Sequence, residues 1–303
     1  MPPRIAVLGS CTVDLVMHVP RQPLPGETLF VDSAALLPGG KGLNQAIAAA
    51  RLGAEVALLG LVGDDPLADV LLRAAVADGI DTAYLRRDPA KETGIAVPVV
   101  MPSGDNSILA APRANLELSV ADVEAAAPAL RACDVFVFQL ETPIEAVLAA
   151  ARLARAAGAI VLMNPAPARE IPDDLFTLSD VLVLNEVEAA VFAPGALDEA
   201  EQAAALMARG PRLVVVTLGA RGGVACDASG CQPFAAFAVD VVDSVGAGDA
   251  FCGALAVALA ERLDTAAAVR FANGAAALSL TGAGAVTSLP RRAELAAFLA
   301  GRV

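Results

Sequence analysis

The segment from Asp243 to Asp249 combines the residue types that phosphoryl transfer needs. An apolar stretch that we expect to be a strand precedes it, and a long apolar helix follows. Unpaired amides of Gly246, Ala247 and Gly248 at the positive end of that helix favour binding of an anion or of a developing phosphoryl charge. Asp249 beside them can take a proton from an attacking hydroxyl. The simpler interpretation is an acidic residue that only complements the helix dipole.

Two common nucleotide-binding motifs do not fit the chain. A dinucleotide fingerprint that starts at Gly246 requires glycine at position 251, where the chain has Phe251. A Walker loop that ends at Lys41 requires glycine at position 35 and a hydroxyl at position 42, where the chain has Ala35 and Gly42. The nicotinamide interpretation is therefore weak, and a P-loop NTPase is excluded.

Composition limits the class of protein. The 303 residues, 56% of them hydrophobic, can bury one large core. No apolar run reaches the roughly 18 to 20 residues of a membrane span, and the first one is too short for a secretory signal. The formal charge of −13 argues against nucleic acid as a partner. We expect a cytoplasmic enzyme that binds neither membrane nor nucleic acid.

The cysteines and the single histidine, His18, exclude two kinds of site. The five cysteines form no C-x-x-C pair, so the sequence excludes a zinc centre and triad chemistry. Cys226 and Cys231 flank a short turn and are expected to face each other across a hairpin. We expect them to be reduced, as is usual inside cells.

Strands and helices alternate along most of the chain, which predicts a mostly parallel α/β sheet with helices on both faces. The expected strands are 5–8, 56–61, 135–139, 159–163, 181–184 and 213–217, with an antiparallel stretch around Gly230. The expected helices are 42–52, 66–77 and three closing helices that begin near Ala247, Thr265 and Arg291.

Two regions interrupt this alternation. Segments 13–19 and 27–37, and later 83–87, 93–101 and 106–110, are expected to be extended, with a hairpin turn at Ser103-Gly104-Asp105. They can pair into one small sheet. We therefore predict a single domain, residues 1–303, in which residues 11–38 and 83–112 form that small sheet.

Polar residues directly follow four expected strands, where ligands of open α/β sheets bind. These positions are Gln139, Asn164, Asn185 and Thr217. Thr142 to Glu145 has the spacing of a capping box, and so does Asn185 with Glu188, so each position also has a purely structural interpretation. Capping does not explain why all four meet at the edge that carries Asp249.

Along essentially its whole length the chain resembles the ribokinase-like carbohydrate kinases. Residues 39–46, Gly-Gly-Lys-Gly-Leu-Asn-Gln-Ala, and residues 243–251 are similar to the two signatures of the family, and segments 25–28 and 164–170 add to the likeness. The resemblance implies a three-layer domain with a small β lid. It also implies transfer of the ATP γ-phosphoryl group to O5 of D-ribose, with Mg²⁺ and a monovalent cation, K⁺, as cofactors.

The resemblance assigns roles by position. The sugar positions are Thr12, Asp14, Gly40, Lys41, Asn44 and Glu141, and Asp249 matches the general base. The amides of Ala247 and Gly248, behind Gly246, match an anion hole. The nucleotide positions are Asn185, Glu188 near Mg²⁺, Thr217, Gly219, Arg221, Gly222, Gly248, and Asn273 beside the adenine. The monovalent-cation positions are Asp243, Val245, Ser279, Gly282, Gly284 and Ser288, several of them through main-chain carbonyls.

One position departs from the family pattern. The usual Gly-Ser-x-Asn-x-Asp is Gly9 to Asp14 here, with Thr12 in place of the amide that meets the sugar. A hydroxyl loses that two-pronged contact, and such losses change substrate discrimination strongly. The alternatives are a 2-deoxyribose kinase, then a fructose or nucleoside kinase. A non-catalytic sugar or nucleotide binder is a further alternative, although a binder has no use for a general base.

A second copy of the chain is the expected macromolecular partner. The exposed edges of a small lid sheet invite pairing, and the resemblance implies a homodimer joined through the lids. The sugar and ATP are the expected small-molecule partners.

Overall fold

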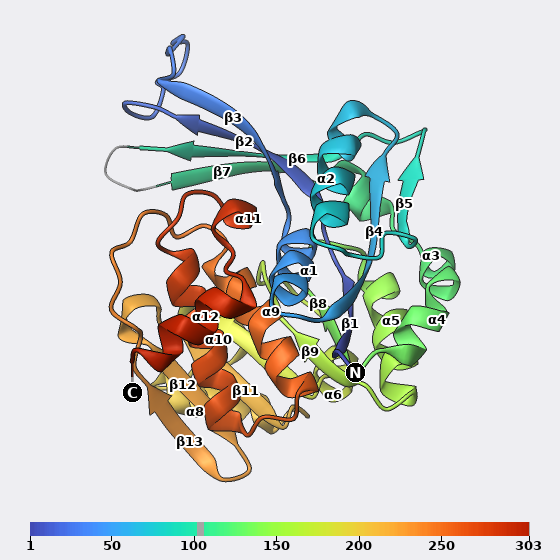
Figure 1. Ribbon diagram of the computed structural model, residues 1–303, viewed down its shortest axis with the longest axis vertical. Coiled ribbons are helices and arrows are strands. Elements are labelled where there is room, and N and C mark those ends of the chain that lie inside the picture. The colour runs from blue at the N-terminus through green and yellow to red at the C-terminus, as the bar shows by residue number, and fades with distance from the viewer. Residues whose placement is uncertain (102–105, 303) are drawn as a thin grey trace.

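The computed structural model describes residues 1–101 and 106–302. Over these residues the chain forms a nine-stranded sheet with helices on both faces and a separate four-stranded sheet (Figure 1). This is the α/β class with a smaller second sheet that the sequence predicts. The turn expected at Ser103-Gly104-Asp105 lies outside the described residues.

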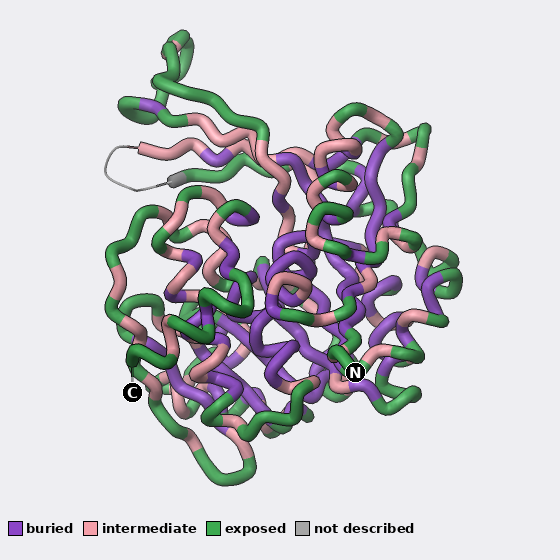
Figure 2. Tube along the Cα trace, in the orientation of Figure 1, coloured by how far each residue is buried: buried purple, intermediate pink, exposed green. Residues whose placement is uncertain are grey.

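The larger sheet is parallel from β5 to β11 and ends in an antiparallel hairpin. In spatial order its strands are β13 (Gly230–Phe234), β12 (Gly223–Asp227), β11 (Leu213–Thr217), β10 (Val181–Asn185), β9 (Ile160–Met163), β8 (Val135–Phe138), β1 (Arg4–Leu8), β4 (Glu55–Gly63) and β5 (Leu85–Asp88). Ile5 and Val7 enter the core on one face, and Ala6 and Leu8 the core on the other. Burial on both faces explains the short apolar runs of the sequence, and Figure 2 shows this buried centre.

Helices cover both faces of the larger sheet. One face carries α1 (Lys41–Arg51), α2 (Pro66–Ala77), α9 (Ala247–Ala260), α10 (Thr265–Ser279) and, packed on α10, α12 (Arg292–Ala300). The other carries α3 (Val120–Ala125), α4 (Ala127–Ala132), α5 (Ile144–Ala156), α6 (Asp173–Leu178), α7 (Glu186–Phe192) and α8 (Glu199–Met207). The short helices are η1 (Arg113–Glu117), η2 (Gly219–Arg221) and α11 (Ala285–Ser288). Within the described residues, no helix combines the length and hydrophobicity needed to cross a membrane.

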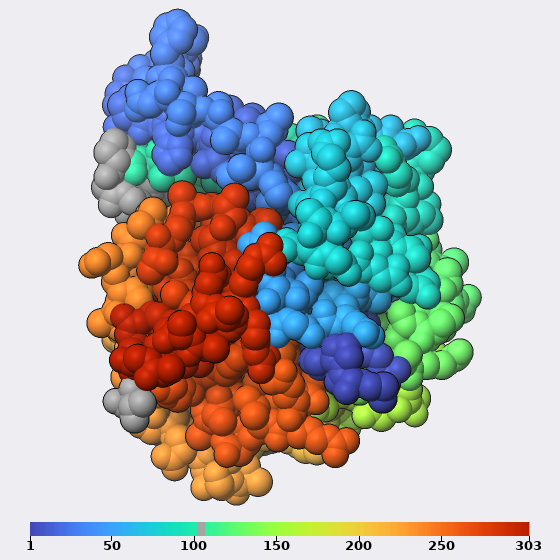
Figure 3. Space-filling model, in the orientation of Figure 1, coloured from blue at the N-terminus to red at the C-terminus, as the bar shows by residue number. Residues whose placement is uncertain are grey.

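The smaller sheet projects from the body of the molecule (Figures 1 and 3). In spatial order its strands are β3 (Ser33–Gly39), β2 (Thr12–His18), β6 (Gly94–Val100) and β7 (Asn106–Ala111). The expected extended segment 83–87 is not part of it, because β5 pairs in parallel with β4 in the larger sheet. Several large apolar side chains of β3 and β7 are more than half exposed, namely Leu36, Ile108 and Leu109.

The apolar stretch before Asp243 was wrongly predicted to be a strand. From Ala235 to Gly246 the chain has no regular structure, and the amide of Val242 donates to the carbonyl oxygen of Leu280 at 2.7 Å. The side chains of Val241 and Val242 are 63% and 64% exposed. These apolar residues therefore lie in an exposed loop before α9 and are not buried in a sheet.

The capping box predicted at Thr142 is also wrong. Helix α5 begins at Ile144 after Pro143, without a side-chain capping bond. The hydroxyl of Thr142 is buried and has no hydrogen-bond partner among the residues described. The carbonyl oxygen of Thr142 instead accepts a hydrogen bond of 2.7 Å from the guanidinium of Arg169, so this segment turns toward the loop after β9.

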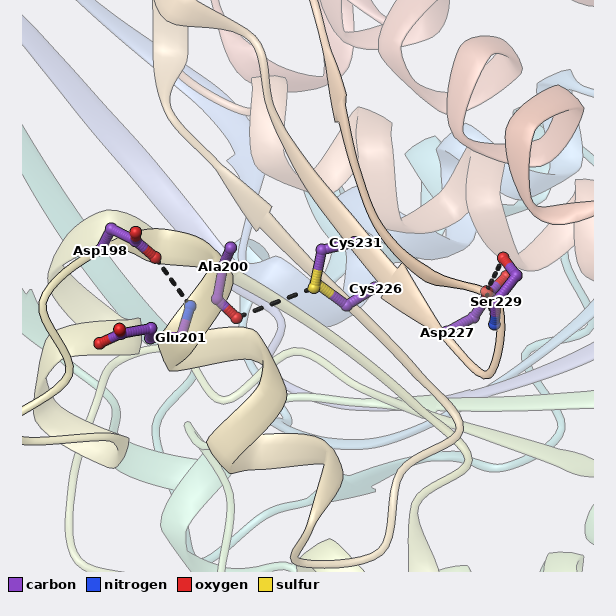
Figure 4. The surroundings of a disulfide bond; sticks show 7 residues. All are labelled: Asp198, Ala200, Glu201, Cys226, Asp227, Ser229 and Cys231. Carbon is purple, nitrogen blue, oxygen red and sulfur yellow. Dashed lines mark hydrogen bonds between the residues drawn. A yellow bond between two sulfur atoms is a disulfide. The ribbon is translucent and has the colours of Figure 1, made fainter.

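Cys226 and Cys231 form a disulfide across the β12–β13 hairpin, so the expectation of reduced thiols was wrong (Figure 4). They lie directly opposite each other, one step from the closing pair Asp227 and Gly230, with their Cα atoms 4.0 Å apart. Antiparallel neighbours approach this closely at the narrow, non-hydrogen-bonded positions of a ladder. The turn is fixed by the carboxylate of Asp227, which accepts from the Ser229 amide at 2.8 Å.

Candidate active site

The site lies where the strand order reverses in the larger sheet, whose strands are parallel at this point. Strand β1 is flanked by β4 on one side and β8 on the other, and ligands of open α/β sheets bind beyond the strand ends at such a point. Ser10 follows β1 and Glu141 follows β8, and the Ser10 hydroxyl donates a short hydrogen bond to the Glu141 carboxylate. The ends of β1 and β8 therefore meet at this point.

A cavity of about 510 Å³, which we call the Asp14 cavity, contains all the predicted sugar positions. These residues are Thr12, Asp14, Gly40, Lys41, Asn44 and Glu141. Ala96 of β6 and Ile108 and Ala110 of β7 supply an apolar wall, so the smaller sheet encloses part of the cavity. Polar groups at the base and apolar groups at the wall are typical of a site that orients a small polar ligand.

A second cavity of about 220 Å³, the Glu188 cavity, contains several of the predicted nucleotide positions. They are Asn185, Glu188, Thr217 and Gly248, joined by Asn164, Val183 and Phe251. Lys41, Gly246 and Asp249 line both cavities. Asp249 therefore lies at the junction, in reach of groups bound on either side.

The amides predicted to form an anion hole lie at the beginning of α9. Gly246 is the N-cap, with φ of 81°, and a Cβ there would lie 2.9 Å from Cβ of Ala285, so only glycine fits without displacement. In the described part of the chain the amide of Gly248 has no acceptor, and that of Ala247 makes only a long contact of 3.4 Å with the Ser244 carbonyl oxygen. These amides remain available to an anion in the Glu188 cavity.

Two amide side chains hold the carboxylate of Asp249, which is 7% exposed. Asn44 Nδ2 donates to Asp249 Oδ2 and Gln45 Nε2 donates to Asp249 Oδ1, both at 2.9 Å. Asn44 Oδ1 is buried without a partner among the described residues. Because Asn44 lines the Asp14 cavity, this oxygen is an acceptor that a ligand hydroxyl can satisfy.

Carboxylates crowd the two cavities; Lys41 lines both of them, and Arg169 lines the Asp14 cavity. Burial raises the pKa of Asp14 to about 6; the hydrogen bond from Thr12 opposes this shift, and the charges of Glu141 and Asp249 add to it. Burial also raises the pKa of Glu188. Burial alone would lower the pKa of Lys41, but the surrounding carboxylates, Asp249 foremost, outweigh it and the pKa is raised. Lys41 is therefore a fixed positive charge at the junction.

The raised pKa of Asp14 predicts pH-dependent sugar binding. Below about pH 6 the carboxylate takes up a proton and loses acceptor capacity for sugar hydroxyls. We expect the affinity for D-ribose, measured by calorimetry without nucleotide, to fall as the pH drops through this value. The Asp14→Asn variant should bind more weakly, and its affinity should be flat over the same range. An equal pH dependence in the variant would assign the effect to another group.

The predicted nucleotide positions do not all lie in the Glu188 cavity. Asn185 and Glu188 form the capping box of α7: the Glu188 amide donates to Asn185 Oδ1 at 2.8 Å, and the Asn185 amide donates to Glu188 Oε2 at 2.9 Å. Both residues therefore cap the helix and also line the Glu188 cavity. Arg221, at the end of η2, pairs with Glu186 and Glu199. Neither Arg221 nor Gly219 and Gly222 beside it lines the Glu188 cavity.

Asn273 also lies outside the Glu188 cavity. Its amide donates to the Ala235 carbonyl oxygen at 2.9 Å, and it lines a separate cavity of about 600 Å³ between the β12–β13 hairpin and α10. The Glu188 cavity itself is smaller than the roughly 300 Å³ of usual small-molecule sites. Only part of a nucleotide fits within it.

The predicted monovalent-cation positions come together in two adjoining loops. Asp243 accepts from the amides of Val245 at 3.0 Å and Gly284 at 2.8 Å. Gly282 lies against Ser288, and the hydroxyls of Ser279 and Ser288 donate to main-chain carbonyls. Each serine oxygen and each Asp243 oxygen keeps an unused lone pair, so the donor set fits a weakly bound monovalent cation.

A dedicated metal cage is not part of the described structure. Over residues 1–101 and 106–302 no three His, Cys, Asp or Glu side chains cluster as metal ligands. Mg²⁺ in phosphoryl transfer usually keeps its waters and binds through one or two carboxylates and the substrate phosphates. Glu188, one of the two carboxylates that line the Glu188 cavity, fits this mode.

Some residues of the site had no assigned role in the sequence. Gln45 and Gln139 are fully buried behind Asp249, and their positions, next to Asn44 and at a strand end, were the only signal. Asn115 of η1 lines the Asp14 cavity and bonds to both the amide and the carbonyl of Cys11. No local pattern marks it, because its contact spans 104 residues of chain.

Comparisons with known proteins identify a family and relatives that match nearly the whole chain. The profile of the pfkB family of carbohydrate kinases matches residues 2–292. A ribokinase from Haemophilus influenzae is 37% identical over 301 residues, covering 97% of this chain and 98% of the relative. A deoxyribokinase from Salmonella typhi is 38% identical over 291 residues, covering 94% and 95%. The structure of Arabidopsis thaliana ribokinase complexed with ribose and ATP superposes with a TM-score of 0.89, at 29% identity and 99% coverage of both chains.

Proposed function

Because this chain belongs to the pfkB family of carbohydrate kinases, we propose that it transfers the γ-phosphoryl group of ATP to O5 of D-ribose, giving ribose 5-phosphate and ADP. One observation carries the proposal. A single buried carboxylate, Asp249, lies where the Asp14 and Glu188 cavities meet, beside the amides that begin α9. The ribokinases among its relatives support D-ribose as the acceptor.

Different residues bind the sugar, remove its proton and stabilise the phosphoryl charge. Asp14, Asn44 and Glu141 hold the sugar hydroxyls in the Asp14 cavity, with the 5-hydroxyl at the junction. Asp249 takes the proton of that hydroxyl as its oxygen bonds to the γ-phosphorus, and the bond from this phosphorus to the ADP oxygen breaks. The amides of Ala247 and Gly248 and the ammonium of Lys41 stabilise the charge on the phosphoryl oxygens.

Two cations complete the proposed site. Glu188 would hold Mg²⁺ through its waters, and the metal would offset the charge of the β- and γ-phosphates. Asp243, Val245, Ser279, Gly282, Gly284 and Ser288 would hold K⁺ in the loops beside α9. These loops contact the N-cap Gly246 through Ala285, so an ordered cation loop supports the position of the anion hole.

A coupled assay of ADP release tests the proposed reaction. Purified protein with ATP, Mg²⁺ and K⁺ is expected to release ADP when D-ribose is added. Absence of ADP release with D-ribose and with every sugar of a panel of pentoses, hexoses and nucleosides would overturn the proposal and favour a binding protein.

A 2-deoxyribose kinase is the second candidate, and Thr12 favours it. The Thr12 hydroxyl donates to Asp14 at 3.1 Å, so its proton is used inside the protein. A relative named deoxyribokinase is as similar to this chain as the ribokinases are. Comparing kcat/KM for the two pentoses decides between the candidates.

Thr12→Asn is expected to shift the preference toward D-ribose. The asparagine adds a second hydrogen-bonding group that the 2-hydroxyl can satisfy, and an unmet buried amide penalises the deoxy sugar. The ratio of kcat/KM for D-ribose to that for 2-deoxyribose should rise roughly tenfold or more. Thr12→Ser serves as the control, because it keeps the hydroxyl and should leave the ratio nearly unchanged. An unchanged ratio in Thr12→Asn would show that residue 12 does not set this discrimination.

We also propose that residues 11–38, 94–101 and 106–112 act as a lid and join two copies into a homodimer. The exposed Leu36, Ile108 and Leu109 of the smaller sheet support this, because apolar side chains on an exposed sheet are a usual contact surface. Light scattering at micromolar concentration should give twice the monomer mass. Replacing Leu109 with aspartate should return the monomer mass.

A further inference from the structure

A row of buried amide side chains lies behind the carboxylate of Asp249. Gln45 of α1 and Gln139 after β8 have no exposed surface, and Asn164 after β9 is 8% exposed. Gln139 Nε2 donates to Gln45 Oε1 at 2.6 Å. Gln45 Nε2 donates to Asp249 Oδ1 at 2.9 Å and to Asn164 Oδ1 at 3.2 Å. Gln45 and Gln139 line neither cavity, so neither contacts a bound sugar or nucleotide there.

The direction of every bond in this row follows from one main-chain atom. Asn164 Nδ2 donates to the carbonyl oxygen of Val183 at 2.9 Å, and a carbonyl oxygen can only accept. Asn164 must therefore turn its own oxygen toward Gln45, and Gln45 must donate to that oxygen from its NH₂ group. That orientation leaves Gln45 Oε1 facing Gln139 and directs the second N–H of Gln45 at Asp249.

The consequence for Asp249 is a fixed carboxylate with both oxygens accepting. Gln45 holds Oδ1 from the buried side, and Asn44 holds Oδ2 from the side of the Asp14 cavity. A flipped Gln45 amide would present an oxygen to the carboxylate and repel it. The flip is disfavoured, because it would place the Gln45 oxygen against the oxygens of both Asp249 and Asn164.

We propose that Gln45 is a positioning residue for phosphoryl transfer, with its donor direction set by Val183 through Asn164 and supported by Gln139. The inference rests on the proposed function. Gln45 acts through Asp249 and touches no reacting atom. Its role is to keep the carboxylate aimed at the junction of the two cavities, where a displacement of about 1 Å can cost roughly 100-fold in rate.

The Gln45→Met variant tests this role. Methionine matches the length and volume of glutamine and removes both donors. We expect kcat to fall roughly 10- to 100-fold, while KM for D-ribose changes by less than about threefold, because an interaction that aligns the base affects the transfer more than ground-state binding. Gln202→Met on α8 is the matched control, since Gln202 also has a buried side-chain oxygen, without a partner in the described residues, and lies outside both cavities.

A double-mutant cycle separates positioning from general stability. In the Asp249→Ala background, Gln45→Met should lower the residual turnover no further, because there is no carboxylate left to aim. Gln139→Met, which does not touch Asp249, should lower kcat less than Gln45→Met and likewise have no effect in that background. If the melting temperature of Gln45→Met shows that this variant does not fold, Gln139→Met is used to test the inference instead.

Two results would overturn the inference. One is a kcat of Gln45→Met equal to that of the parent enzyme, and the other is an equal loss with and without the Asp249 carboxylate, which would indicate a structural role. An inactive wild-type protein would instead refute the proposed function itself, so the two failures can be told apart.

Discussion

Replacing Asp249 with alanine is expected to lower kcat about 100-fold or more, in the range that general bases contribute. The carboxylate is the acidic side chain that lines both cavities, so no neighbour in the described residues can take the proton from the same place. The affinity for the sugar should fall less, because Asp14, Asn44 and Glu141 remain. Single-turnover kinetics with saturating D-ribose and ATP measure the effect on the chemical step.

Asp249→Asn is the matched variant for this prediction. It keeps the size of the side chain, but its NH₂ group faces the donors of Asn44 or Gln45, so it should be as slow as Asp249→Ala and less stable. Turnover close to that of the parent enzyme in either variant would remove Asp249 from the mechanism.

Gly246→Ala is the second change with a large expected effect. The N-cap of α9 has φ of 81°, and the added Cβ would lie 2.9 Å from Cβ and 3.0 Å from Cα of Ala285. Either α11 or the first turn of α9 must move, and a shift of α9 displaces the amides of Ala247 and Gly248. Loss of such an anion hole costs roughly 100- to 1000-fold in kcat.

Gly79→Ala provides the control for backbone strain. Gly79 follows α2 with φ of 76°, and its added Cβ would meet nothing within 4 Å. Both substitutions carry the left-handed penalty of about 1 to 2 kcal/mol. Gly79→Ala should therefore lower the melting temperature without changing kcat. If the two variants lose activity equally, the position of the α9 amides is not what limits the transfer.

The sequence predicted the parallel core well because its signals are local. Buried strands such as Ile5 to Leu8 are continuous apolar runs, and helix α2 begins at the proline and ends before the glycine that mark its ends. The sugar positions came from the family resemblance, and the structure brings them together at one cavity. Their convergence on one cavity follows from the parallel order of the strands.

The remaining features depend on contacts distant in sequence. Val241 and Val242 have the composition of a strand, but they belong to neither sheet and lie in an exposed loop. Thr142 has the spacing of a cap, yet its main chain is held by Arg169. The proposed role of Gln45 depends on Val183, a residue distant in sequence that Gln45 reaches through Asn164. Patterns within one segment do not report such contacts.

The crystal structure of the wild-type protein with D-ribose and a non-hydrolysable ATP analogue tests the central claim most directly. We predict that the sugar lies in the Asp14 cavity with its 5-hydroxyl within hydrogen-bonding distance of Asp249 Oδ2 or Oδ1. The terminal phosphate should face that hydroxyl from the Glu188 cavity, at the amides of Ala247 and Gly248. A sugar whose 5-hydroxyl points away from Asp249, or a terminal phosphate bound away from the start of α9, would contradict the assignment of Asp249 as the base.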